Sequence, residues 1–409
     1  MSLALPRRLS LVLGLTQTLA WATTFYLPAV LVRPVATATG LSPTLLLGGF
    51  SWALLVAGLT SPAVGRRIEQ AGGRGVLASG TVVMASGLVL LAAAPGLVGW
   101  YAGWSVLGVG MARGLYDAAF ATIGRLVGER ARGAIFGVTM MAGFASSIGW
   151  PMGVGLVRLF GWRGMLLTDA AIQLGINLPL LLLLVPRVEM VPGAVPGVAP
   201  GASVAVAPAG AKGGTGGGTG RGGRSVLIWL GVFLCLRAGL TAVVSVHALA
   251  LMRGVGLDTA GAVAVAALFG PFQVTGRLFD WALARWLDPL RSALLGAVLL
   301  PAGVAALLGG APAVVFAAGY GMSNGILTIT RGTLPMHLFG ARGYATRLGR
   351  LALPQLLAQA LAPTVLTPLV LAFPARTVLA GAGVVALVAM AALGVAASAA
   401  RAGAHADAG

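Results

Sequence analysis

Two arginines and one aspartate lie in apolar stretches where charged side chains are rare. The stretch GMARGLYDAAF (110–120) carries Arg113 and Asp117 four residues apart, and Arg237 directly follows the apolar run LGVFLCL. A guanidinium binds a carboxylate or phosphate through two parallel N–H bonds, so an arginine in such a setting favours an anionic ligand. Arg113 has a second interpretation, an ion pair with Asp117 at i+4 of one helix. Arg237 has no acid within one turn and is the stronger candidate for binding an anion.

Charged residues are rare because nearly the whole chain is apolar. Of 409 residues, 58% are hydrophobic and 9% are charged, whereas soluble proteins carry about 25% charged residues. A helix needs about 20 mostly apolar residues to cross a bilayer, and the alternating pattern of a membrane β-barrel is absent. The sequence therefore predicts an all-α membrane protein in a lipid bilayer. Its twelve predicted transmembrane helices are residues 9–32, 44–64, 76–95, 98–124, 134–157, 164–185, 225–251, 259–279, 291–309, 312–334, 344–371 and 376–400.

The basic residues predict the orientation of these helices. Lys and Arg number 27 against 9 acids, and most of them fall in the loops on the side of the N-terminus, as the positive-inside rule describes. Both termini are therefore expected in the cytoplasm, with the chain crossing a bacterial-type cytoplasmic (inner) membrane many times. Because the positive charge is spread over these loops, it indicates topology rather than binding to nucleic acid.

A low-complexity segment divides the chain into two similar halves. Residues 187–224 are rich in Gly, Pro and Ala, a composition typical of a flexible linker, and they separate an N-terminal half (1–186) from a C-terminal half (225–409). The stretch GVGMARGL (108–115) of the first half reappears as GYGMSNGI (319–326) in the second. We therefore expect two pseudo-symmetric six-helix halves with the same orientation in the membrane.

The chain resembles the transporters of the major facilitator superfamily (MFS) over nearly its whole length. The loop GRRIEQAGGR (65–74) is similar to that family's signature of glycines, one acid and basic residues, and GRLFDWALAR (276–285) is a second, partial copy. The matching residues are Gly65, Glu69, Gly72 and Arg74 in the first copy and Gly276, Asp280 and Arg285 in the second. The resemblance implies a conformational latch in which Glu69 pairs with Arg125 or Arg74. The alternative is a tight glycine turn with arginines that set the topology.

The resemblance also implies which side chains face a central cavity. In this family the first helix of each three-helix unit lines the cavity, which here means the first, fourth, seventh and tenth spans. The candidate substrate-binding residues on these spans are Gln17, Tyr26, Arg113, Arg237 and Asn324. Arg331 lies near the inner end of the tenth span and is a candidate gate residue, since its long side chain reaches the membrane surface from there. Asp169 and Arg163 are expected to form a local pair near the outer surface.

Asp117 is the candidate proton-coupling residue. A solute anion that competes for Arg113 would release Asp117 to take a proton, which would link solute binding to proton binding. The alternative is a structural ion pair between the two side chains, with no role in coupling.

Transport of a small solute is the function that these observations favour. The chain has 3 His, 1 Cys and 9 acids scattered over its spans, which is no metal cluster, and it has no nucleotide-binding loop. We therefore expect no cofactor and no enzymatic activity. A secondary active transporter, functional as a monomer and working by alternating access with H+ as the coupling ion, is therefore expected. The two mid-span arginines, Arg113 and Arg237, favour a small organic anion as its solute. The alternatives are a proton-coupled efflux antiporter for drugs and other hydrophobic solutes, and a solute-sensing receptor on the same scaffold.

Overall fold

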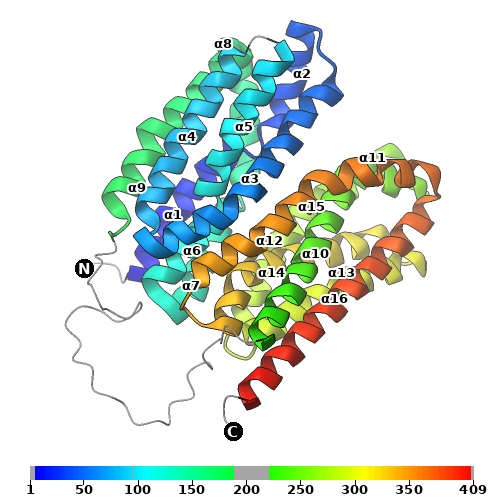
Figure 1. Cartoon of the computed structure of the whole chain (residues 1–409). Coiled ribbons are helices and arrows are strands. Elements are labelled where there is room, and N and C mark those ends of the chain that lie inside the picture. Colours follow the sequence, from blue (N-terminus) through cyan, green and yellow to red (C-terminus); the bar gives the residue numbers. More distant parts are fainter. Residues whose placement is uncertain (1–4, 95, 188–220, 407–409) are drawn as a thin grey trace. The chain divides into compact units, whose positions relative to one another are not determined.

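The computed structural model of the chain is helical in every described segment, which confirms the predicted all-α class. It describes residues 5–94, 96–187 and 221–406, so most of the predicted linker lies outside the described residues. The helices are α1 (Leu5–Ala22), α2 (Pro28–Thr39), α3 (Pro43–Ala71), α4 (Gly73–Ala93), α5 (Gly96–Gly114), α6 (Tyr116–Val127), α7 (Ala131–Ala142), α8 (Ala145–Ile172), α9 (Leu178–Leu184), α10 (Arg221–Gly254), α11 (Thr259–Ala267), α12 (Phe269–Leu283), α13 (Pro289–Leu308), α14 (Ala313–Phe339), α15 (Tyr344–Ala372) and α16 (Ala375–Ala406) (Figure 1). A short 3₁₀ turn (Gly128–Arg130) precedes α7, and a π-helical turn (Gln173–Asn177) joins α8 to α9.

Several predicted spans are built from two helices rather than one. Spans one, four, five and eight correspond to the pairs α1–α2, α5–α6, α7–α8 and α11–α12. Nine helical segments of the described chain are long and apolar enough to cross a membrane by length and composition, and one of them, Ala131–Leu184, holds both spans five and six. These two spans meet inside α8 at Gly161, whose φ of 69° reverses the chain in a backbone conformation that suits glycine. These segments account for ten of the predicted spans, and the pairs α1–α2 and α5–α6 account for spans one and four.

The described residues form two compact units. Unit 1 contains α1 to α9 together with Phe339–Leu353, and unit 2 contains α10 to α13, α14 up to Leu338, α15 from Pro354 onward, and α16. In unit 1, α4 packs against α5 and α8, and α1 packs against α7 (Figure 1). In unit 2, α16 packs against α10 and α13. The domain limits at residues 186 and 225 stay a prediction.

Helix ends in both units follow local sequence rules. Pro43 and Pro289 occupy the first turns of α3 and α13, where the missing N–H of proline is not needed. Asp258 caps α11 by accepting the Gly261 N–H at 2.8 Å, and Asp288 caps α13 by accepting the Arg291 N–H at the same distance. The loop between α3 and α4 contains a single residue, Gly72, with φ of 79°, so the glycine of the signature sits where the turn requires it.

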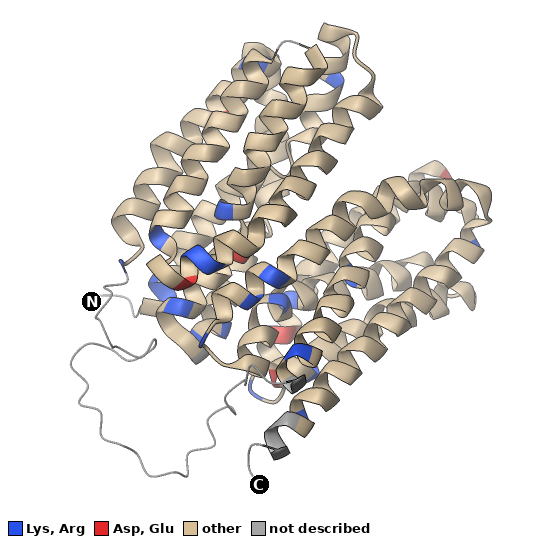
Figure 2. Ribbon diagram, in the orientation of Figure 1, with Lys and Arg blue, Asp and Glu red and all other residues tan. Residues whose placement is uncertain are grey.

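Charged residues in unit 1 gather at one end of its helices. Figure 2 shows most of the blue ribbon of this unit near the start of α1 and the end of α3. The opposite end carries few charges, and the helix surfaces between the two ends are almost uncharged (Figure 2). This distribution agrees with the positive-inside pattern of the sequence. The assignment of the charged end to the cytoplasm stays a prediction.

Candidate functional site

Arg237 lies in the interior of unit 2, in contact with α14. Its side chain projects from α10 and is 4% exposed. Nη2 donates to Ser323 Oγ at 2.9 Å and to Asn324 Oδ1 at 3.4 Å, and both acceptors come from α14. Thr241, one turn along α10, donates to the same Asn324 oxygen at 3.0 Å. Two candidate substrate-binding residues of the sequence, Arg237 and Asn324, are therefore in direct contact.

A second row of hydrogen bonds holds this arginine cluster in place. The Tyr320 hydroxyl donates to the Thr241 carbonyl at 3.0 Å and lies 2.7 Å from Ser245 Oγ. Ser323 Oγ donates to the Gly296 carbonyl of α13. Since these bonds join α10, α13 and α14, they fix the side chains that surround Arg237. The sequence alone did not single out Ser323, Thr241 or Tyr320, because serine, threonine and tyrosine are common in membrane helices for packing reasons.

Three donor atoms of the arginine cluster have no partner in the described part of the chain. Arg237 Nε and Nη1 and Asn324 Nδ2 are buried and bond to none of the described residues, and no described carboxylate pairs with Arg237. Buried donors are almost always satisfied in native proteins, and a buried unpaired charge is unfavourable. The arrangement is therefore suited to a ligand that supplies acceptor oxygens, such as a carboxylate.

Arg113 and Asp117 are separated by a helix break. The helix α5 ends at Gly114, Leu115 is extended with φ of −91° and ψ of −168°, and α6 begins at Tyr116. Arg113 turns to α4 instead, where its Nη2 and Nε donate to Ser79 Oγ at 2.5 Å and 3.2 Å. Within the described part of the chain no ion pair joins Arg113 to Asp117. The predicted i+4 pair is therefore wrong, because i+4 spacing brings side chains together only in an unbroken helix.

Gln17 and Tyr26, the two candidates on span one, contact different parts of unit 1. Gln17 is buried, and its Nε2 donates to the Gly114 carbonyl at 2.6 Å, at the point where α5 ends. Helix-terminal carbonyls lack an intrahelical partner, so this bond stabilises the break. Tyr26 lies in the connection between α1 and α2 and makes an edge contact with Trp150, with ring centroids 5.9 Å apart.

Removing the Gln17 amide should destabilise unit 1. We expect Gln17→Leu to lower the free energy of unfolding by roughly 1–3 kcal/mol, because it leaves a buried carbonyl without its donor. Thr18→Val is the matched control, since Thr18 is also buried on α1 but bonds only to Gly14 of its own helix. Thermal unfolding of the purified variants in detergent measures the difference. Equal losses in both variants would assign Gln17 to packing alone.

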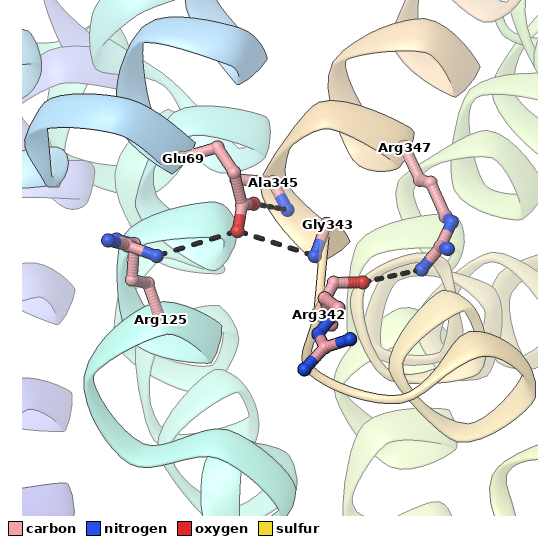
Figure 3. Close-up of polar contacts among 6 residues, drawn as sticks. All are labelled: Glu69, Arg125, Arg342, Gly343, Ala345 and Arg347. Atoms are coloured by element: carbon pink, nitrogen blue, oxygen red, sulfur yellow. Dashed lines mark hydrogen bonds and ion pairs between the residues drawn. The ribbon is translucent and has the colours of Figure 1, made fainter. Parts of the chain in front are cut away.

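Glu69 joins α3 to the start of α15 within unit 1. Its Oε1 accepts from Arg125 Nη1 at 3.4 Å and from the Gly343 N–H at 3.3 Å, and its Oε2 accepts from the Ala345 N–H at 3.0 Å (Figure 3). The carboxylate therefore caps the N-terminus of α15, where unpaired N–H groups and the helix dipole favour negative charge. Arg347 secures the same loop by donating from Nη1 to the Arg342 carbonyl at 2.7 Å (Figure 3). The sequence identified Glu69 and Arg125, but nothing in it pointed to the two backbone partners.

The other signature residues have different positions. Gly65 lies against α15, where a Cβ atom would come within 3.1 Å of Gly349 Cα. Arg74, the second predicted partner of Glu69, makes no hydrogen bond or ion pair with a described residue. In the second copy Asp280 is buried on α12 and the Arg285 guanidinium lies 3.8 Å from the ring centroid of Trp286.

Arg331 is held by a glutamine of span eleven. With the amide of Gln355 oriented so that its oxygen faces α14, this oxygen accepts from Arg331 Nη1 at 2.7 Å and from Nε at 3.2 Å. The assignment follows from the hydrogen bonds that it satisfies. This bond joins α14 to α15 inside unit 2, and a gate role for Arg331 stays a prediction.

Comparisons with known proteins agree with this architecture. No protein-family model and no curated protein sequence matches the chain. Solved structures match it in fold. FucP, an MFS transporter in its outward conformation, aligns with a TM-score of 0.63 at 15% identity over 96% of this chain and 97% of that chain. A variant of FucP, the fucose:proton symporter of E. coli, aligns with a TM-score of 0.64 at 15% identity over the same shares.

A third match is the MFS proton:xylose symporter XylE bound to 6-bromo-6-deoxy-D-glucose. It aligns with a TM-score of 0.67 at 15% identity over 94% of each chain. These alignments cover nearly the whole length on both sides, and they include both six-helix halves. The chain therefore has the twelve-helix fold of the major facilitator superfamily transporters.

Proposed function

We propose that the chain is a secondary active transporter that carries a small anionic solute across the cytoplasmic membrane by alternating access, coupled to protons. The observation that carries the proposal is Arg237, which is buried, pairs with no described carboxylate, and has Nε and Nη1 bonded to no described residue. A planar guanidinium with two such donors matches a carboxylate in bidentate geometry. The fold neighbours FucP and XylE are proton-coupled sugar symporters, which supports a small solute and proton coupling.

Transport by the purified chain tests this proposal. Proteoliposomes are loaded with a panel of small carboxylates, with fucose and xylose, and with cationic dyes, and counterflow of each labelled compound is measured. We expect counterflow of a carboxylate. Counterflow of the sugars alone would show that the solute is a sugar rather than an anion. Counterflow of the dyes alone would establish drug efflux. A chain that binds a panel compound without moving it would be a receptor.

Substitution of Arg237 tests the site itself. Arg237→Lys keeps the charge but loses the planar fork, so we expect the affinity for the transported carboxylate to fall by about 10–100-fold, the equivalent of one charge-assisted hydrogen bond. Arg237→Gln should abolish binding. The matched control is Arg253→Gln, because Arg253 lies on the same helix, α10, and is exposed. Normal transport by both Arg237 variants would exclude this residue from the binding site.

Efflux of an apolar solute is a second candidate function because unit 1 contains an aromatic cluster. Trp21 lies 4.6 Å from Phe25 and 4.7 Å from Tyr116 between ring centroids, and Tyr26 contacts Trp150. Trp21 Nε1 is buried and has no partner among the described residues. Aromatic faces bind flat apolar molecules and cations. If Tyr26→Ala abolishes dye transport while Arg237→Gln leaves it intact, the aromatic cluster rather than the arginine binds the solute.

A further inference from the structure

Asp169 is a fully buried acid without a hydrogen-bond partner among the described residues. It lies on α8 in unit 1 with 0% exposure, and neither Oδ1 nor Oδ2 bonds to any described residue. Arg163, its predicted partner, donates from Nε to the Ala92 carbonyl at 3.1 Å, and its guanidinium lies 4.1 Å from the ring centroid of Trp162. The predicted local pair is therefore wrong, because the arginine bonds to the end of α4 instead.

None of the charged residues described near Asp169 compensates its charge. Helix α8 packs against α1, α2, α4 and the π-helical turn. The charged residues of these elements and of α8 itself are Arg7, Arg8, Arg33, Arg74, Arg158 and Arg163, and the one titratable group in the α1–α2 connection is Tyr26. None of them forms an ion pair or hydrogen bond with Asp169 in the described chain. A carboxylate buried without a partner is strongly unfavourable, whereas a neutral carboxylic acid is tolerated. The geometry therefore favours a proton on Asp169.

The polar face that contains Asp169 reaches the break in span one. Gln173 and Asn177 follow at intervals of four residues and are also buried. Gln173 Nε2 donates to Thr23 Oγ1 at 2.7 Å, and Asn177 Nδ2 donates to Gln173 Oε1 at 2.9 Å and to the Thr16 carbonyl at 3.2 Å. Thr23 directly follows the end of α1, so Asp169 lies one helical turn beyond the residue that contacts this break.

Two irregular backbone segments adjoin the acid. The connection of residues 23–27 separates α1 from α2, and the π-helical turn Gln173–Asn177 interrupts span six. Single π-helical turns occur frequently at functional sites, and non-helical backbone at membrane depth is tolerated where it is buried in protein or lines a water-filled cavity.

We propose that Asp169 is the proton-binding carboxyl of the transport cycle. In the conformation seen here it holds a proton as a neutral acid. When the segments at residues 23–27 and 173–177 rearrange, the O–H bond breaks, the proton passes to water, and the carboxylate later regains a proton from water on the other side of the membrane. The role in transport rests on the proposed function, but proton binding by Asp169 does not require it. This proposal differs from the prediction from the sequence, which assigned proton coupling to Asp117.

Infrared spectroscopy of the full-length protein in phosphatidylethanolamine–phosphatidylglycerol liposomes tests whether Asp169 carries a proton. The measurement needs no solute. At neutral pH we expect the C=O stretching band of a protonated carboxylic acid. The band should move when H2O is exchanged for D2O, and it should disappear at high pH. Asp169→Asn should remove the band, and Asp117→Asn should retain it.

Three results would overturn the proposal. Loss of the band in Asp117→Asn rather than Asp169→Asn would assign the proton to the other acid. A band that does not shift in D2O would belong to a carboxylic acid that does not exchange its proton with water. Absence of the band would show that Asp169 is ionised. If Asp169→Asn does not fold, Asp169→Glu decides, since it keeps an acid but should shift both the band and its titration midpoint. A protein that shows the band but no transport would refute the proposed function alone.

Discussion

Replacing Gly276 by valine should lower the free energy of unfolding of unit 2 by about 3 kcal/mol. A Cβ atom at this position would lie 2.7 Å from the Cα and 2.9 Å from the carbonyl carbon of Met322 on α14. Both obstructing atoms belong to the backbone, so the clash is relieved only if α12 and α14 move apart. Small residues allow such close approach of membrane helices, and unit 2 depends on it at this crossing.

Gly381 on α16 provides the matched control in the same unit. A Cβ atom at Gly381 would have no atom within 4 Å, so Gly381→Val should change the stability by less than about 1 kcal/mol. Both substitutions place a β-branched residue inside a helix of unit 2, so the cost in helix propensity is similar. Thermal unfolding followed by the fluorescence of the 9 tryptophans measures both variants. Equal destabilisation would show that propensity, and not the contact with Met322, sets the loss.

Glu69→Gln should speed hydrogen exchange of the Gly343 and Ala345 amides by roughly 10–100-fold, the loss of one charge-assisted hydrogen bond of about 1.5–3 kcal/mol. In the native chain both carboxylate oxygens accept bonds, one from Arg125 and Gly343 and the other from Ala345. A glutamine amide has a single oxygen. Whichever way it is turned, its NH2 group faces a donor, so the cap of α15 is broken on one side.

Two further variants distinguish the contribution of the helix cap from that of the Glu69–Arg125 ion pair. Arg125→Gln removes a partly exposed ion pair with a 3.4 Å separation, and such pairs contribute about 0–1 kcal/mol; its effect on the same amides should stay below tenfold. Asp258→Asn alters the cap of α11 and should leave these amides unchanged. Exchange is followed by mass spectrometry on peptides that cover residues 340–350. If Arg125→Gln matches Glu69→Gln, the ion pair rather than the helix cap holds the loop.

The sequence predicts the twelve spans correctly because hydropathy depends on composition alone, but it does not predict where a span is broken. Residues 98–124 are mostly apolar, apart from Arg113 and Asp117, and contain no proline, so they indicate one helix. In the structure Leu115 is extended and divides the span. The bond from Gln17 to the Gly114 carbonyl stabilises this break, and its two partners lie far apart in the sequence. The Arg113–Asp117 prediction fails for this reason.

Partners from distant parts of the chain limit the prediction of the site as well. Arg237 stood out in the sequence because it is a lone charge in an apolar run, and burial without an acid partner agrees with that interpretation. Its contact with Ser323, 86 residues away, depends on how α10 meets α14. Asp169 was misjudged because a nearby arginine in sequence suggests a pair, whereas the Arg163 side chain points to Ala92. Spacing along a helix shows which groups are able to meet, and packing decides which of them do.

The π-helical turn at Gln173–Asn177 affects how span six aligns with its relatives. A π turn closes its hydrogen bonds over five residues instead of four, so it holds one residue more than the same length of regular helix. Each residue of α9 therefore faces the direction that the preceding residue would face in an unbroken α-helix. A residue-by-residue alignment with a straight helix slips by one position here, and a single-residue gap within residues 173–177 restores the match of inward-facing side chains. Sequence comparisons that forbid such a gap would pair the leucines of α9 with the wrong faces.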